Sequence, residues 1–176
     1  MTSITGFAEV AAPDARVLIL GSMPGDASLV ANEYYAHPRN AFWPIMGALF
    51  DAGPELPYAE RLERLRRRRI ALWDVVHRCV RPGSLDARIE RDSVEANDFS
   101  GLFHHAPRVA AVFFNGRAAE TLYRRHVMPL RPAAGRRIEY HALPSTSPAH
   151  AAMSRDDKLA RWAAVSELLE RLSAHG

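Results

Sequence analysis

Short apolar runs alternate with helical patterns along the chain, and this alternation constrains the fold most strongly. Runs of this length, bounded by charged and turn-forming residues, are typical of strands buried on both faces of a sheet. The strand candidates are residues 16–20, 70–76, 109–114 and 137–142. The helix candidates are residues 44–50, 58–69, 92–104, 117–126 and a segment that begins at residue 154. Strands that alternate with helices predict a three-layer α/β/α sandwich with a central, mainly parallel sheet of about four strands.

Two polar tetrads mark expected helix starts. Asp92-Ser-Val-Glu95 resembles a capping box, in which side chains satisfy the first free N–H groups of a helix. Ser154-Arg-Asp-Asp157 is a second N-terminal signal and precedes a stripe of apolar residues at helical spacing. The stripe consists of Leu159, Trp162, Val165, Leu169 and Leu172. These patterns predict helices that begin near residues 92 and 154.

The chain has 176 residues, which is enough for one domain with its own core. It contains no internal repeat, low-complexity tract or linker, so residues 1–176 are expected to form a single domain. No secretory signal is recognisable, and no stretch is apolar enough to span a bilayer. A cytoplasmic protein with no membrane partner is therefore expected, and a monomer is the default.

Cys79 is the only cysteine of the chain. A single thiol excludes an internal disulfide framework and an iron–sulfur cluster held by four thiolates of this chain. The eight histidines show no pairing with cysteine at the spacing of a zinc site. We therefore expect neither a metal nor another cofactor.

The formal net charge is only +3, yet the isoelectric point is about 9.4, and the basic residues are mostly arginines. A modest basic excess is compatible with binding to nucleic acid. The densest run, residues 66–69, places four arginines at the expected end of a helix. A solvated face that complements the helix dipole is the favoured interpretation, and a DNA contact is the alternative.

Three polar segments follow expected strand ends. They are residues 21–40, 115–116 and 143–150. In an open parallel sheet the ligand site lies beyond the carboxyl ends of the strands, so these segments are expected to surround it. The first segment opens with Gly21-Ser-Met-Pro-Gly25, a turn whose backbone N–H groups can face a ligand. It lacks the Gly-Lys-Ser/Thr ending of a phosphate-binding loop.

Residues 35–43, Tyr-Ala-His-Pro-Arg-Asn-Ala-Phe-Trp, crowd aromatic, imidazole and amide groups into one connection. This string and Phe-Asn-Gly at residues 114–116 resemble the mismatch-specific uracil/thymine branch of the uracil-DNA glycosylase superfamily. Residues 21–25, with Leu-Pro-Ser-Thr-Ser-Pro-Ala at residues 143–149, are more similar to its hypoxanthine-DNA (deoxyinosine) branch. The resemblance implies a monofunctional enzyme whose partner is DNA containing a damaged base. Such an enzyme flips out the deaminated base, hydrolyses its N-glycosidic bond and leaves an abasic site.

Met23 stands where the mismatch-specific branch carries the asparagine that positions the attacking water. A thioether cannot orient water usefully. The resemblance to the deoxyinosine branch therefore implies that Asn40 is the catalytic residue. An asparagine carbonyl can hold water and stabilise an oxocarbenium-like sugar without titrating. Gly21, Ser22 and Met23 are then expected to bind the base, with backbone N–H groups stabilising the leaving group.

Three further residues are expected to bind the base. Tyr35 is implied to stack on the extruded base, and a core tyrosine is the alternative. Asn115 can contact a base edge with both a donor and an acceptor, although a turn residue is also consistent with its place before a glycine. His37 is expected either to bond a base edge or a phosphate, or simply to hold its loop.

The loop after the last strand is implied by the resemblance to compress the DNA backbone and enter the minor groove. Its small hydroxyl side chains and prolines make a stiff segment that can approach a phosphate closely. The expected DNA-binding residues are Pro144, Ser145, Thr146, Ser147 and His150. A loop that only caps the last helix is the alternative.

Deoxyinosine is the favoured substrate, because the Met23/Asn40 pattern and residues 146–148 fit that branch. Uracil, or another damaged base in a mismatch, is the second choice. Met23 also leaves open a catalytically silent nucleic-acid-binding module on the same scaffold, and a hydrolase of free nucleosides or nucleotides is a third alternative. No lysine stands in the motifs, so no Schiff-base lyase step is expected.

Overall fold

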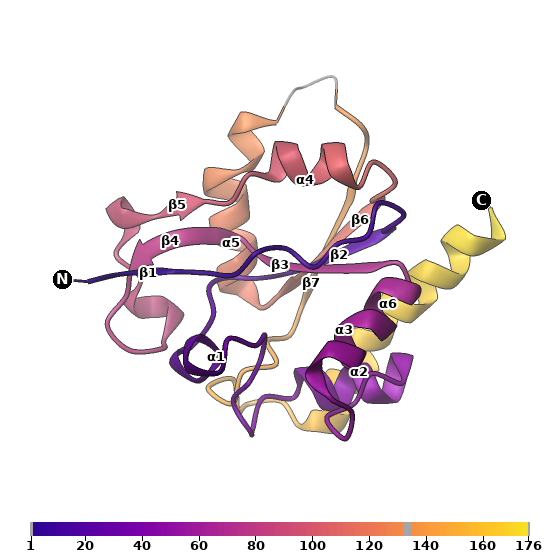
Figure 1. The fold of residues 1–176 in the computed structure, drawn as a ribbon, viewed down its shortest axis with the longest axis horizontal. Helices are drawn as coiled ribbons and strands as arrows, with labels where there is room; N and C mark the ends of the chain where they lie inside the picture. The colour runs from indigo at the N-terminus through magenta and orange to yellow at the C-terminus, as the bar shows by residue number, and fades with distance from the viewer. Residues whose placement is uncertain (1, 132–134, 176) are drawn as a thin grey trace.

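The predicted apolar runs form one parallel sheet (Figure 1). The computed structural model describes residues 2–131 and 135–175. The sheet consists of β2 (Val17–Gly21), β3 (Ile70–Asp74), β6 (Ala111–Asn115) and β7 (Glu139–Leu143), in the order β3-β2-β6-β7. Every neighbouring pair in it is parallel. The predicted sandwich around a four-stranded parallel sheet is confirmed.

Helices cover both faces of this sheet, because alternate side chains of each strand point to opposite faces. On one side, Ile19 and Phe113 belong to the core with residues of α2 (Phe42–Phe50), α3 (Tyr58–Arg67) and α6 (Arg155–Ala174). On the other side, Leu20 and Phe114 belong to the core with residues of α4 (Phe99–His105) and α5 (Arg117–His126). Figure 1 shows these two sets of helices on opposite sides of the strands.

The last helix begins where the sequence predicts. The Ser154 hydroxyl oxygen accepts a hydrogen bond from the backbone N–H of Asp157 at 3.1 Å and so caps the first turn of α6. The predicted apolar stripe packs into the core, where Trp162 and Val165 are fully buried. Neither α6 nor any other helix within the described residues is long and apolar enough to cross a membrane.

The helix predicted from residue 92 is wrong in its first half. Residues 91–93 form a 3-10 turn, β5 (Glu95–Ala96) follows, and α4 begins only at Phe99. Glu95, which the capping box requires in the first helical turn, instead lies in β5 and pairs with Arg78. The adjacent Ser93 hydroxyl oxygen accepts a hydrogen bond from the backbone N–H of Val80 at 2.8 Å. Pairing with a neighbouring strand therefore overrides the local capping pattern.

The run predicted as one strand over residues 70–76 divides into two. β3 ends at Asp74, and β4 (Val76–Val80) joins a second, antiparallel sheet with β1 (Ser3–Thr5) and β5. The predicted strand divides here because the regular pairing of β3 with β2 ends at Gly21 and Asp74. The next two residues, 75 and 76, donate their backbone N–H groups to the carbonyls of Gly21 and Ser22. Asp74 consequently lies at the carboxyl edge of the parallel sheet. The remaining elements are α1 (Asp26–Ala31) and the 3-10 turns η1 (Asp86–Arg88), η2 (Arg91–Ser93) and η3 (Met128–Leu130).

Candidate active site

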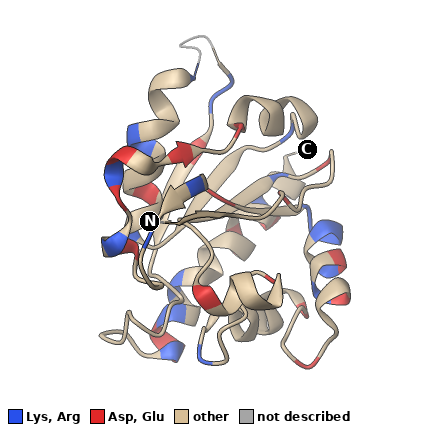
Figure 2. Ribbon diagram, turned by 60° about the vertical axis from the view of Figure 1, so that its left-hand side comes forward, with Lys and Arg blue, Asp and Glu red and all other residues tan. Residues whose placement is uncertain are grey.

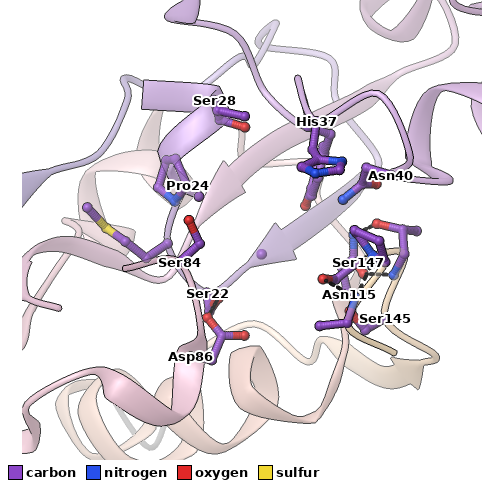
Figure 3. Close-up of a pocket in the computed structure, with 18 of the residues that line it drawn as sticks. Ser22, Pro24, Ser28, His37, Asn40, Ser84, Asp86, Asn115, Ser145 and Ser147 are labelled. Atoms are coloured by element: carbon purple, nitrogen blue, oxygen red, sulfur yellow. Dashed lines mark hydrogen bonds between the residues drawn. The ribbon is translucent and has the colours of Figure 1, made fainter. Parts of the chain in front are cut away.

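A cavity of about 430 Å³ lies at the carboxyl edge of the parallel sheet (Figure 3). All three polar segments that follow predicted strand ends contribute to its lining. The predicted site residues in the lining are Gly21, Ser22, Met23, Tyr35, His37, Asn40, Asn115, Ser145, Thr146 and Ser147. The structure therefore brings these residues together, whereas Pro144 and His150 lie outside the lining.

Gly21 forms part of the cavity floor between two strand ends. It is the last residue of β2 and pairs in register with Asp74, the last residue of β3. A Cβ atom at this position would lie 2.9 Å from the Tyr35 hydroxyl oxygen and closer still to the Asp74 carboxylate. Because only glycine has no Cβ, it alone allows the carboxyl group and the phenol to approach the strand end this closely.

Asp74 is a candidate functional residue that the sequence did not indicate. It lines the cavity although it is only 4% exposed, and its Oδ2 atom has no hydrogen-bond partner among the described residues. Burial, reinforced by the Asp86 carboxylate and opposed by Arg81, raises the pKa of Asp74 to about 7. A carboxyl group in this state is partly neutral near pH 7 and can donate a hydrogen bond. The sequence did contain a signal, because Asp74 is a polar residue that directly follows the apolar run ending at Trp73. The prediction of one continuous strand over residues 70–76 placed it inside a strand and not at a strand end.

Tyr35 lies between the core and the cavity. One face of its ring stacks on Phe42, with ring centroids 4.1 Å apart and planes inclined by 30°. The hydroxyl oxygen is buried and has no hydrogen-bond partner among the described residues. Burial and the Asp74 carboxylate raise the pKa of the phenol, so Tyr35 remains a neutral donor. Since Phe42 occupies one face, a base can stack only on the other.

Asn40 connects the cavity to the start of α2. Its Oδ1 atom accepts a hydrogen bond from the backbone N–H of Phe42 at 2.9 Å, which orients the side chain. Figure 3 shows Asn40 on the side of the cavity opposite Asp86, beside the loop that carries Ser145 and Ser147. A carbonyl oxygen has two lone pairs, so Oδ1 can accept a second hydrogen bond, from water or a ligand.

His37 holds the loop that carries Asn40. Its Nδ1 atom accepts a hydrogen bond from the backbone N–H of Arg39 at 3.1 Å, and its carbonyl accepts one from the backbone N–H of Asn40 at 2.9 Å. The ring also lines the cavity. The predicted loop-holding role is therefore observed, and a contact with a base or phosphate stays a prediction.

Asn115 and Thr146 form a closed hydrogen-bonded pair beneath the loop that follows β7. Oδ1 of Asn115 accepts from the backbone N–H of Thr146 at 2.9 Å, and Nδ2 donates to the Thr146 hydroxyl oxygen at 2.9 Å. Each polar atom of the amide makes one hydrogen bond to Thr146, so one N–H and one lone pair of Oδ1 are not used by this pair. Thr146 is only 1% exposed, although it lines the cavity, and its contact with DNA stays a prediction.

Ser145 and Ser147 remain partly exposed at the rim of the cavity. Oγ of Ser145 accepts a hydrogen bond from the backbone N–H of Ser147 at 3.2 Å, which tightens the turn. Gly116 has a φ of +92°, and a Cβ there would lie 3.0 Å from the Cβ of Ser145. Glycine therefore serves both the left-handed backbone and the close approach of the serine loop.

Pro144 and His150 anchor the two ends of this loop through their backbones. The Pro144 carbonyl accepts from the Trp162 indole N–H at 2.9 Å, and the His150 carbonyl accepts from the Lys158 ammonium group at 2.8 Å. Both donors belong to α6. The alternative that the loop docks on the last helix is thus observed, in addition to the contribution of its serines to the cavity.

The remaining wall joins Ser22 of the first motif to Asp86, which no motif indicated. The Ser22 hydroxyl donates to Oδ1 of Asp86 at 2.6 Å, and burial raises the pKa of Asp86. The buried Arg81 guanidinium donates to the carbonyls of Pro24 and Gly83 and so fixes the Gly/Pro turn. Within residues 2–131 and 135–175, no group of three or more His, Cys, Asp and Glu side chains is placed to hold a metal ion.

Met23 contributes to the lining, yet its side chain packs with Val76 and Cys79 in a small separate core. Its thioether therefore closes the space behind the Gly/Pro turn. The polar groups available to a ligand come from the other strand ends and from Asn40.

The family model of the uracil DNA glycosylase superfamily matches residues 7–172. This chain belongs to that superfamily. A hypoxanthine DNA glycosylase of Methanosarcina acetivorans is 37% identical to it over 161 residues, which are 91% of this chain and 96% of the relative. Another protein of that name, from Methanosarcina barkeri, is 41% identical over 113 residues, 64% of this chain and 70% of that one.

A solved structure agrees with this membership of the uracil DNA glycosylase superfamily. The solution NMR structure of a candidate uracil DNA glycosylase from Methanosarcina acetivorans matches the fold with a TM-score of 0.75. The two chains are 34% identical, and the match covers 96% of this chain and 99% of that one. The family predicted from the motifs is confirmed, and the sandwich architecture is shared.

Proposed function

We propose that this protein is a monofunctional DNA glycosylase that excises hypoxanthine from deoxyinosine in DNA and leaves an abasic site. The observation that carries the proposal is the cavity at the carboxyl edge, to which Asp74 and Tyr35 contribute buried polar atoms with no hydrogen-bond partner in the described part of the chain. Such atoms are stable only when something bonds them, and a flipped base has the matching edges. The volume falls within the range of small-molecule sites, about 300–1000 Å³. The names of the Methanosarcina relatives support hypoxanthine as the base.

Asp74 interacts with the departing base in this proposal. When the glycosidic bond breaks, its electron pair leaves with the base, which gains negative charge. A neutral Asp74 donates a hydrogen bond to an acceptor atom of the base and stabilises that charge, whereas an ionised carboxylate would repel it. Hypoxanthine offers ring nitrogens and a carbonyl oxygen as acceptors. Tyr35 adds its ring face as a stacking surface and its hydroxyl as a second donor.

Asn40 positions the attacking water. The water donates a hydrogen bond to Oδ1, which is already oriented by the N–H of Phe42. The water oxygen then bonds to C1′ of the sugar, and the base takes up a proton that balances the one released by the water. The amide carbonyl also stabilises the positive charge on the oxocarbenium-like sugar.

The serine loop contacts the DNA strand beside the flipped nucleotide. Ser145 and Ser147 are its accessible hydroxyls, and the Asn115–Thr146 pair keeps the loop in place. Lys158 is the only lysine of the chain, and its ammonium group bonds loop carbonyls outside the cavity lining. No lysine lines the cavity among the described residues, so hydrolysis without a Schiff-base lyase step is expected. A monomer and a cytoplasmic location stay predictions from the sequence.

Excision from defined duplexes tests this function. Duplexes with one deoxyinosine, one uracil or only normal bases are incubated with the wild type, with Asn40→Ala and with the exposed control Asn32→Gly, then treated with alkali. We expect strand cleavage at deoxyinosine by the wild type and the control, and a loss of at least about a hundredfold in Asn40→Ala. Asn32 already has the left-handed backbone that glycine adopts readily, which makes the control conservative.

Each other outcome has a defined meaning. Cleavage at uracil alone would replace hypoxanthine with uracil as the substrate. Binding without cleavage of any damaged duplex would support the silent nucleic-acid-binding module that Met23 suggests. Full activity of Asn40→Ala would remove the catalytic assignment of this residue and leave the proposed reaction intact.

A further inference from the structure

Arginines precede all four strands at the opposite, amino-terminal edge of the parallel sheet. Arg69 directly precedes β3 and Arg16 directly precedes β2, while Arg108 and Arg137 stand shortly before β6 and β7. The strand order β3-β2-β6-β7 therefore sets the four side by side. Backbone hydrogen bonds join the segments that lead into these strands. The backbone N–H of Arg16 donates to the Arg69 carbonyl at 2.8 Å, and that of Ala110 donates to the Arg16 carbonyl at 2.8 Å. We call Arg16, Arg69, Arg108 and Arg137 the arginine edge.

The arginine edge lines a shallow depression of about 1250 Å³ that is separate from the active-site cavity. Three further arginines line the same depression: Arg67, Arg68 and Arg136. The parallel strands have five residues each. At about 3.3 Å per residue, they separate the two edges of the sheet by about 16 Å. A ligand in the active site therefore leaves the arginine edge open.

Acidic residues neutralise this depression only in part. Arg69 pairs with Asp14 at 3.7 Å, Arg68 with Asp51 at 3.9 Å, and Arg67 with Glu63 at 3.4 Å. All six side chains are about half exposed or more, so these pairs are weak. No ion pair of Arg16, Arg108 or Arg137 occurs among the described residues. The Nε atom of Arg16 is buried without a hydrogen-bond partner there. Elsewhere, acidic residues stand beside basic ones on several helices (Figure 2).

Helix dipoles account for only part of this positive charge. The carboxyl ends of α3 and α4 lead into this edge, and each carries roughly half a negative charge that nearby arginines complement. Seven guanidinium groups exceed that requirement, even with Glu170 in the lining. Like charges held this close are stabilised by a bound anion.

We propose that the arginine edge binds the phosphate backbone of a second DNA segment, remote from the one whose base enters the active site. Strands about 4.8 Å apart give a row about 14 Å long, over which one DNA strand carries roughly four phosphates. Guanidinium forks match phosphate oxygens in pairs. A duplex is too stiff to reach both edges of so small a domain, so the two edges hold separate segments.

A folded acidic protein fits this surface less well. Stable protein interfaces depend on buried aromatic or aliphatic anchors. The exposed large hydrophobic residues among the described positions are Val30, Leu85 and Leu130, and none of them lines this depression. The large apolar side chains that do line it, Phe50, Leu169 and Leu172, pack against the core and are at most partly exposed. The row of charge is therefore the main feature open to a partner, and it is suited to a linear polyanion.

The test counts undamaged duplexes bound to one protein molecule. A labelled 12-base-pair duplex of normal sequence is titrated into the full chain at low salt, and the stoichiometry is measured by sedimentation. The edge variant is Arg69→Gln/Arg108→Gln/Arg137→Gln, and the control is Arg78→Gln/Arg91→Gln/Arg161→Gln, which removes the same charge from other exposed positions. We expect two duplexes on the wild type and control, and one on the edge variant.

Salt dependence gives a second readout. At protein concentrations high enough to measure the residual binding of a second duplex to the edge variant, losing three phosphate contacts makes the slope of log K against log salt less negative by about 2.7. Two duplexes on the edge variant, or an equal loss in the control, would overturn the proposal. Displacement of the second duplex by a deca-glutamate peptide that binds more tightly than DNA would also overturn it, in favour of an acidic protein segment. If the triple variant unfolds, the single substitution Arg108→Glu at an exposed position replaces it. We then expect the affinity for the second duplex to fall at least tenfold.

This test is independent of base excision, because the probe contains no damaged base. Single-turnover excision from a short deoxyinosine duplex is expected to be unchanged in the edge variant. Failure to excise hypoxanthine would refute the proposed function and leave the second DNA site standing. A single bound duplex in the wild type would refute the second site alone.

Discussion

The protonation state of Asp74 decides what this residue can do for a departing base. Its Oδ2 atom is buried with no hydrogen-bond partner within residues 2–131 and 135–175, and Gly21 leaves room for the carboxyl group at the strand end. The charged and titratable groups around it are Asp86, Arg81, Tyr34, Tyr35 and, across the cavity, His37. Burial dominates their combined influence and keeps the acid form populated near neutral pH. The residue therefore acts as a donor only over a limited pH range.

Replacing Asp74 tests this behaviour. We expect the single-turnover excision rate of the wild type to fall as pH rises through about 7, by about tenfold per pH unit at the steepest. Asp74→Asn keeps an N–H donor that does not ionise, so its profile is expected to be flat across that range. Asp74→Leu is expected to be slow at every pH, and the exposed control Asp156→Asn to follow the wild type. An Asp74→Asn profile that declines like the wild type would show that another group titrates.

At the scale of elements, the cavity depends on how the loop at residues 144–150 is attached. The Asn115–Thr146 pair ties it to the end of β6, and Lys158 and Trp162 tie it to α6. The backbone N–H of Ala41, at the start of α2, also donates to the Thr146 carbonyl at 3.0 Å. Elements from both ends of the chain thus hold the serines against the cavity.

The substitution Thr146→Val removes one of these attachments at nearly constant volume. It deletes the acceptor of the Asn115 side chain and leaves a buried N–H without a partner. We expect the free energy of unfolding to fall by about 1–3 kcal/mol, measured by urea denaturation, and duplex binding to weaken several-fold. The exposed helical substitution Thr121→Val is the matched control and is expected to change stability by less than about 0.5 kcal/mol. Equal effects of the two would mean that the pair does not stabilise the loop.

At the scale of the whole molecule, stability depends on the same buried carboxyl group. The pKa of Asp74 is about 7 in the folded protein and about 3.9 in an unfolded chain. The folded state therefore holds the proton more tightly. This contribution to stability is complete below about pH 4 and is lost as pH rises through about 7.

Denaturant unfolding at two pH values measures this linkage. Between pH 5 and pH 8 the wild type is expected to lose about 3 kcal/mol more than Asp74→Asn, because the variant has no proton to release at this position. Asp156→Asn is again the control and is expected to match the wild type. If the wild type and Asp74→Asn lose the same stability, the Asp74 carboxyl group is already ionised at pH 5.

Much of the architecture could be predicted from the sequence because it rests on local patterns. The apolar runs of β2 and β6 and the capped, striped helix α6 carry their signals within a few residues. The capping pattern at Asp92 failed because Glu95 pairs with Arg78 on a neighbouring strand, a contact that no local pattern encodes. Asp74 was missed for a similar reason, since the strand ends where the chain bonds Gly21 and Ser22.

The sequence by itself determined the family, the parallel sheet and the convergence of three polar segments at one edge of it. Apolar periodicity and motif chemistry are properties of the chain, so they can be read before it folds. Only the tertiary structure decided that Asp74 is a buried acid lining the cavity and that the Asn115 amide bonds Thr146. It also decided that the arginines preceding four strands share one edge of the sheet. Burial and proximity between distant residues arise only when the strands come together, and they determine protonation, hydrogen-bond capacity and local charge.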